Sequence, residues 1–231
     1  MSRWLGCLVV GVCASGCVVD EAPPDRRQGV VADRPNTVAA DGHRHELDVD
    51  WVRFSELEIH RNALAVVRGR VVEQWTGSHR TYPIDPRSGR ELTPEEAGDR
   101  FAELPLLTSV VAIDERLDGR DAGEEMVSGA RIEVVQLGGR YADGCWVEPT
   151  DQRLLREGDE VAVFLKPAGM EPRERPASRP RWSIVGGQQG LVPLTRGLVD
   201  PIPDTVFGRY AARPVSELAR DVQRLAAGVE Q

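Results

Sequence analysis

Cys145 is the residue with the clearest chemical potential in this sequence, because a cysteine thiolate is a strong nucleophile. It lies in the segment Asp143-Gly144-Cys145-Trp146. A nucleophilic cysteine needs a histidine within hydrogen-bond reach and a third group that orients this histidine. All the histidines precede Cys145 in the chain: they are His43, His45, His60 and His79. An enzyme would require one of them beside the sulfur in an open cleft.

The order of these residues argues against two known arrangements. Papain-like enzymes place the histidine after the cysteine, and here it comes before. The L,D-transpeptidases of bacterial envelopes have an upstream histidine, but their signature also has one two residues before the cysteine, where this chain has Asp143. We therefore predict a buried or loop-packed thiol and no catalytic residue. An envelope enzyme with Cys145 as nucleophile is the alternative hypothesis.

The segment from Asp41 to Glu46 has the spacing most suited to a metal. In an extended strand, His43 and His45 would present both imidazoles on one face. A structural zinc site needs four ligands with supporting partners, and nothing in the sequence fixes the others. We predict solvated linker residues here, with no metal and no cofactor.

Two sets of residues are candidates for a non-catalytic binding surface. If Trp75, Trp146 and Trp182 converge on one exposed face, they could bind a glycan or a peptide. A glycine-rich run follows one predicted strand and precedes another, so no helix N-terminus is available there to hold phosphate. We predict a hairpin turn whose backbone amides could form a binding lip. Its candidate binding residues are Gly186, Gly187 and Gly190.

A mainly β domain must position these residues. Several segments are β-branched or alternate between apolar and polar residues, with Gly or Pro turn signals between them. They are 63–74, 106–117, 131–137, 160–165, 182–185 and 191–194. Apolar residues recur at helical spacing from Val215 to Ala227, with Ser216 as the expected cap. The pattern predicts a five- to seven-stranded barrel or sandwich with a C-terminal α-helix.

Composition narrows the class of protein. The chain has 231 residues, of which 41% are hydrophobic and 29% charged, as expected for one soluble domain with extensions. Its formal net charge is −8. An acidic chain binds nucleic acid poorly, because non-specific binding depends on neutralising phosphates. We predict no nucleic-acid partner.

The first residues have the three-part pattern of a secretory signal. Arg3 lies in a short positive start, and an uncharged apolar run from Trp4 to Val12 is followed by small residues. Such a run covers roughly 14 Å as a helix, well under the roughly 30 Å hydrocarbon core of a membrane. The segment Ala14-Ser15-Gly16-Cys17 resembles the lipobox of bacterial lipoproteins, with Ala14 where leucine is usual. The resemblance implies cleavage before Cys17 and lipidation of Cys17. Ordinary signal-peptidase cleavage after Gly16 is the alternative.

The sequence thus divides into four expected parts. Residues 1–16 are a signal peptide, 17–50 a lipid-anchored flexible tether rich in proline and charge, 51–212 the β domain, and 213–231 a C-terminal helix and tail. Lipid on Cys17 would anchor the exported protein to a bacterial membrane, facing the periplasm or the cell exterior.

Residues 60–194 resemble a family of uncharacterised bacterial exported proteins. The shared motifs are Val67–Val72, Gly158–Leu165 and Gly186–Gly190. Their order is also similar to that of netrin-like modules, which are five-stranded OB-type barrels, and this implies an OB-like barrel. The metalloproteinase-inhibitor branch of those modules uses a free N-terminal cysteine amine, which a lipidated Cys17 would not offer. We expect a cell-envelope lipoprotein with a non-catalytic binding or scaffolding domain, whose partners are membrane lipid and an envelope protein or glycan.

Overall fold

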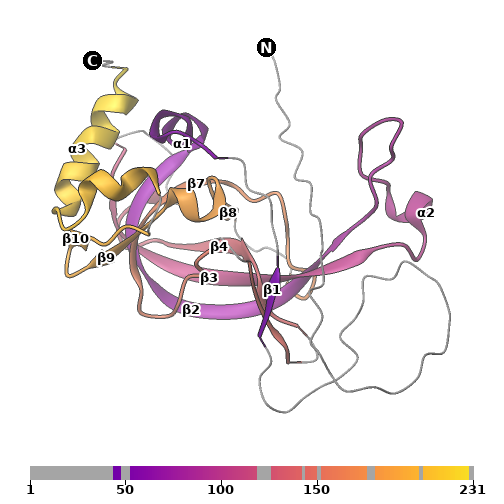
Figure 1. The fold of residues 1–231 in the computed structure, drawn as a ribbon. Coiled ribbons are helices and arrows are strands. Elements are labelled where there is room, and N and C mark those ends of the chain that lie inside the picture. Colours follow the sequence, from indigo (N-terminus) through magenta and orange to yellow (C-terminus); the bar gives the residue numbers. More distant parts are fainter. Residues whose placement is uncertain are drawn as a thin grey trace.

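The computed structural model describes residues 44–47, 53–118, 126–141, 144–149, 152–175, 180–202 and 205–228. The predicted signal peptide, Cys17 and most of the predicted tether lie outside these ranges. The protein is mainly β, with a mixed seven-stranded sheet, a smaller three-stranded sheet and a C-terminal helix (Figure 1). Among the described residues, no helix is long and apolar enough to cross a membrane.

The strands lie close to the predicted segments. They are β1 (Arg44–Leu47), β2 (Ala65–Thr81), β3 (Ala102–Arg116), β4 (Arg131–Leu137), β5 (Gly139–Arg140), β6 (Trp146–Pro149), β7 (Glu160–Pro167), β8 (Arg181–Ile184), β9 (Leu191–Thr195) and β10 (Leu198–Val199). The α-helices are α1 (Glu56–Asn62), α2 (Pro94–Ala97) and α3 (Val215–Ala226), and the 3-10 helices are η2 (Gly187–Gly190) and η3 (Val206–Tyr210).

A long antiparallel hairpin of β2 and β3 runs through the whole molecule. The two strands pair from Val67 opposite Arg116 to Thr81 opposite Ala102. Both strands extend beyond the predicted segments 63–74 and 106–117, so that the ladder continues to Thr81. The outer part of the hairpin projects as an arm with α2 at its tip (Figure 1).

Five strands of the large sheet close into a ring. β2 pairs antiparallel with β3 and with β7, and β3 pairs antiparallel with β4. β4 then pairs with β8 in parallel, and β8 returns to β7 in the antiparallel sense. Strands β9 and β10 extend the sheet from β7. The five- to seven-stranded, mainly β prediction is confirmed at this level, and so is the C-terminal helix.

The predicted hairpin turn at Gly186 to Gly190 is wrong. β8 and β9 do not pair with each other. Instead both pair with β7, at Leu165–Pro167 and Glu160–Val163 respectively. The two strands lie end to end along one edge of β7, and η2 connects the end of β8 to the start of β9. The glycine run is therefore an insertion in a discontinuous strand.

Apolar residues fill both faces of the ring wall near β7. The interior contains alternating side chains of the ring strands, among them Val67, Val163 and Trp182. The opposite face, with Val66 and Phe164, packs against α1, η3 and α3. This double coverage explains why β7 is a continuous apolar run rather than an alternating one. Helix α3 starts after Pro214, so the predicted cap Ser216 lies inside the helix.

The three-stranded sheet has the order β1-β6-β5. β1 belongs to the segment predicted as a tether, and it pairs in parallel with β6. Beside this sheet, Leu106 of β3 and Leu137 of β4 form a third apolar cluster with Val147 of β6.

Candidate functional site

A shallow, largely open cleft of about 530 Å³ lies on the surface between the outer end of β2 and the loop between β7 and β8. The residues that line it come from these two elements. They are His79, Arg80, Tyr82, Ala168, Gly169, Glu171 and Arg173. The cleft thus unites two segments that lie about ninety residues apart in the sequence.

Backbone and carboxylate hydrogen bonds fix the β7–β8 loop onto β2. The Arg173 amide donates to the Ser78 carbonyl at 2.9 Å. The Glu174 carboxylate accepts from the Ser78 amide at 2.8 Å and from the Ser78 hydroxyl at 2.6 Å. Although burial opposes it, these hydrogen bonds hold the pKa of Glu174 below its ordinary value. Glu174 is therefore an ionised clamp at neutral pH.

Gly77 permits this close approach. A Cβ at position 77 would lie 2.7 Å from the Glu174 Oε2 atom and 3.0 Å from Pro172. The neighbouring His79 faces the loop as well, with its Nδ1 atom 3.2 Å from the Glu171 carbonyl. This contact holds the His79 imidazole against the loop backbone.

Arg80 and Tyr82 form the β2 side of the cleft, and the ring of Phe101 packs against both. The guanidinium of Arg80 lies 4.0 Å from the ring centroid of Phe101, the residue that precedes β3. This distance is within the range of a cation–π contact. The Tyr82 ring meets the same phenylalanine edge to face, with centroids 6.4 Å apart. These contacts hold Arg80 and Tyr82 at the cleft wall.

Two guanidiniums of this region share one carboxylate oxygen. The Nε atom of Arg80 and the Nη1 atom of Arg173 each lie 3.4 Å from Oε1 of Glu103. The three side chains are 34%, 48% and 38% exposed, so water reaches all of them. Such long, solvated contacts stabilise the fold little. They leave both guanidiniums able to exchange partners.

The predicted tryptophans do not share one exposed face. Trp182 is only 5% exposed and lies in the ring interior. Trp75 is half-buried on the opposite face, where Thr108 and Val135 are its neighbours across the sheet. Its ring lies 5.4 Å from the Arg175 guanidinium and 5.3 Å from that of Arg181. Trp146, half-buried in β6, belongs to the other sheet.

The predicted glycines contribute to close packing. Gly186 has φ +62°, and a Cβ there would lie 2.8 Å from the Phe54 ring. A Cβ at Gly190 would lie 2.5 Å from the Val185 carbonyl oxygen. Gly187 and Gly190 are buried within η2. Close packing accounts for the glycines at these positions, and no ligand is needed to explain them.

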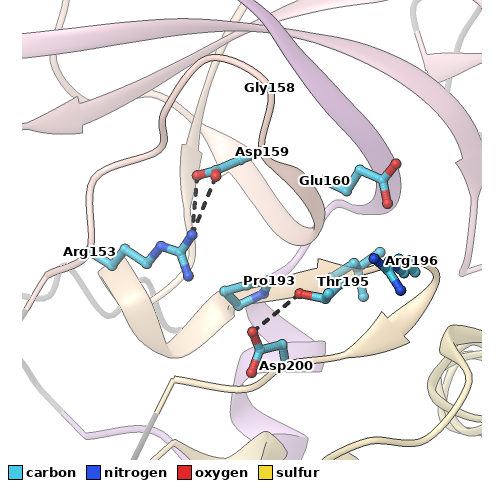
Figure 2. A pocket seen from close by; sticks show the side chains of 9 residues that line it. Arg153, Gly158, Asp159, Glu160, Pro193, Thr195, Arg196 and Asp200 are labelled. Carbon is cyan, nitrogen blue, oxygen red and sulfur yellow. Dashed lines mark hydrogen bonds and ion pairs between the residues drawn. The ribbon is translucent and has the colours of Figure 1, made fainter.

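A smaller hollow of about 290 Å³ lies at the start of β7 and the end of β9 (Figure 2). Most of its charged side chains already have partners. Arg153 pairs with Asp159 at 3.4 Å, and the Thr195 hydroxyl donates to Asp200 at 3.3 Å (Figure 2). Arg196 has φ +53°, in a turn where glycine or asparagine is usual. This mixed, internally paired surface does not favour one class of ligand.

Cys145 lies at the entrance to β6 and is half-buried. Its sulfur approaches the Trp146 carbonyl at 3.9 Å. The parallel pairing of β1 with β6 sets His45 opposite Val147, so the segment predicted as a solvated linker forms a strand beside the one that follows Cys145. His43 lies outside the described residues. Among those that the structure describes, no group of His, Cys, Asp and Glu has the arrangement of a metal site.

The sequence-based search missed the cleft residues Arg80 and Arg173, and Glu103 beside them. One signal was present: residues 166–181 contain five basic and two acidic residues in a chain of net charge −8.

No family model matches the chain, and no curated protein matches it significantly.

Proposed function

We propose that this protein is a cell-envelope lipoprotein, anchored through lipid on Cys17, whose β domain binds a ligand in the cleft between β2 and the β7–β8 loop. The domain binds without catalysis, and it stands at a bacterial membrane facing the periplasm or the cell exterior. The observation that carries the binding proposal is the cleft itself, with Arg80 on one wall against Phe101 and the opposite loop fixed to β2 by Glu174.

The five-stranded ring supports an OB-like, netrin-like barrel as the finer description of the fold. Numbered along the chain, its strands are β2, β3, β4, β7 and β8. Around the ring they follow the order β2-β3-β4-β8-β7. OB barrels bind ligands on their second and third strands and on the loops between strands 1 and 2 and between strands 4 and 5. The corresponding loops here are 82–101 and 168–180, and the cleft lies where they meet β2.

The anchor is tested by metabolic labelling with an alkyne fatty acid. We expect label on the native chain and none on a Cys17→Ser variant, because the thiol of Cys17 is the predicted acylation site. The two chains differ by one atom, so export and expression can be compared directly by immunoblot. A label that persists on Cys17→Ser, or an unlabelled native chain, contradicts the lipoprotein proposal.

The cleft is tested in cells by a photo-crosslinking residue. We expect benzoylphenylalanine at position 82 to form an adduct upon illumination, because Tyr82 lines the cleft. The matched control is position 198, where Leu198 is 42% exposed in β10 and lies outside the cleft lining. Adducts are detected by a shift on an immunoblot. Equal adducts at both positions, or none at position 82, would count against binding at this site.

An envelope enzyme with Cys145 as nucleophile is the second candidate function. The register of β1 and β6 favours it, because it brings His45 into the strand beside the one that follows Cys145. A histidine-paired thiolate is alkylated by iodoacetamide well below the ordinary thiol pKa of about 8.5. If the enzyme proposal holds, His45→Ala removes this reactivity. An alkylation rate that rises only near the ordinary pKa excludes it.

A further inference from the structure

The outer edge of β2 is open where it borders the cleft. Strand β7 pairs with β2 only as far as Arg70 opposite Glu160, and no described strand pairs with this edge farther along the arm. At Ser78 the β7–β8 loop uses the edge, because the Ser78 amide donates to Glu174 and its carbonyl accepts from the Arg173 amide. The backbone groups of Ser78 therefore point away from β3, toward the loop.

The backbone of Arg80 points the same way. Hydrogen-bonded and non-bonded pairs alternate along an antiparallel ladder, and Ser78 opposite Pro105 is a non-bonded pair. Two residues farther along, with no register shift between them, Arg80 opposite Glu103 is a pair of the same kind. The Glu103 carbonyl accordingly accepts from the Tyr141 hydroxyl, 3.3 Å away. The N–H and C=O of Arg80 thus point out of the β2 edge at the cleft, and neither has a hydrogen-bond partner in the described part of the chain.

The opposite wall of the cleft also has backbone donors to offer. Gly169 and Glu171 of the β7–β8 loop line the cleft, and neither amide has a partner among the described residues. A Cβ at Gly169 would meet no described atom within 4 Å, so the space beside this residue is open. Unpaired backbone groups therefore lie on both sides of the cleft.

The charges of the cleft are balanced. Arg80 and Arg173 lie on its walls, Glu171 lines it, and Glu103 contacts both guanidiniums at 3.4 Å. Such a surface selects neither a polyanion nor a polycation. An extended polypeptide matches the free groups of Arg80, because one residue of an added strand exchanges both an N–H and a C=O with the residue opposite it. The hydroxyls of a glycan have no fixed pair of this kind.

Resting on the proposed function, we propose that the ligand of the cleft is an extended peptide segment of another envelope protein, which adds to the edge of β2 at Arg80. One ligand residue donates its N–H to the Arg80 carbonyl and accepts from the Arg80 amide. The amides of Gly169 and Glu171 are donors for ligand carbonyls on the other side. Tyr82 offers an aromatic ring to a ligand side chain. Backbone pairing supplies affinity, and the side chains around the cleft supply specificity.

The probe is a peptide selected from a phage library of random dodecapeptides against the full chain, purified in detergent. The selected peptide is synthesised with a fluorophore, and its affinity is measured by fluorescence anisotropy. We expect a peptide that binds the native chain and depends on the backbone of Arg80. A peptide whose affinity is the same for every variant at position 80 contradicts the proposal.

Arg80→Pro is the variant that isolates the backbone. It removes the outward N–H of position 80 but no hydrogen bond of the β2–β3 ladder, and proline is tolerated at such edge positions. Arg80→Ala is the matched variant, because it loses the same side chain and keeps the N–H. We expect the peptide to bind Arg80→Pro at least about ten-fold more weakly than Arg80→Ala, since the ligand carbonyl loses its donor. Circular dichroism checks that both variants keep the fold.

A second measurement leaves the protein unchanged. Each residue of the selected peptide is N-methylated in turn, which removes one backbone donor at a time. We expect the affinity to fall at least about ten-fold at the residue that faces Arg80, and less than about three-fold at its two neighbours, whose amides point away from β2. Losses without this alternation contradict strand addition, and so does a scan without any loss.

The outcomes separate this inference from the proposed function. Equal affinity of the peptide for Arg80→Pro and Arg80→Ala overturns strand addition, as does a selection that yields no peptide. If the crosslink at position 82 still forms in cells, the binding cleft stands and its ligand is held by side chains, as a glycan would be. If that crosslink is also absent, the proposed binding function fails together with the inference.

Discussion

Replacing Gly69 with alanine is expected to lower the free energy of unfolding by about 3 kcal/mol. Gly69 lies at a register shift in β2, where the strand bends into the ring. A Cβ there would lie 2.3 Å from the Ala112 carbonyl oxygen and 2.8 Å from the Val111 side chain. The nearer neighbour is backbone of β3, which can retreat only by separating the two central strands. Urea unfolding followed by far-UV circular dichroism measures the change.

The matched control for this change is Gly208→Ala. Gly208 lies in η3, and within the described part of the chain no atom outside its own helix and chain neighbours lies within 4 Å of the added Cβ. The same methyl group should therefore change stability by less than about 1 kcal/mol, with either sign. If Gly69→Ala behaves like Gly208→Ala, the close approach of β2 and β3 at this point is wrong.

Local sequence pattern predicted the strands well because each strand carries its own apolar signal. The segment 131–137 was predicted with the bounds of β4, where Ile132 and Val134 face the ring interior. Pairing between distant strands has no such signal. The parallel contact of β4 with β8, which closes the ring, depends on residues about fifty positions apart. Only the three-dimensional register reveals it.

The wrong hairpin at Gly186 to Gly190 has a specific physical origin. Glycines with positive φ appear both in hairpin turns and in interruptions of a strand, so they give one local signal for two structures. The choice is decided by β7, which is long enough to pair with β8 at one end and β9 at the other. This long-range property cannot be inferred from the glycines.

The candidate site was less predictable than the fold. Tryptophans are frequent in binding surfaces and were therefore the first candidates in the sequence. In the structure, however, Trp182 is buried in the core and Trp75 packs against an arginine. Arg80 and Arg173 are two among many arginines in the chain. They become distinctive only because the β7–β8 loop folds onto β2 and both reach Glu103.

Replacing Glu133 with leucine is expected to destabilise the protein by about 3 kcal/mol. Glu133 of β4 lies opposite Arg181 of β8, and its Oε2 accepts from the Arg181 Nε atom at 2.7 Å. The Arg181 side chain is only 1% exposed, and its Nη1 atom has no hydrogen-bond partner among the residues that the structure describes. Without Glu133, a buried positive charge loses its ion pair at the strand contact that closes the ring. The change is measured by urea unfolding.

A double variant separates the lost charge from lost packing at this contact. Glu133→Leu combined with Arg181→Met removes both charges and should recover at least half of the lost stability, since a well-packed apolar pair can replace a buried ion pair. The more exposed pair of Arg68 and Glu115, 3.6 Å apart with side chains 33% and 50% exposed, serves as comparison. Glu115→Leu should cost less than about 1 kcal/mol, because water screens that pair. Additive losses in the double variant would mean that packing, rather than an uncompensated buried charge, sets the stability of the ring closure.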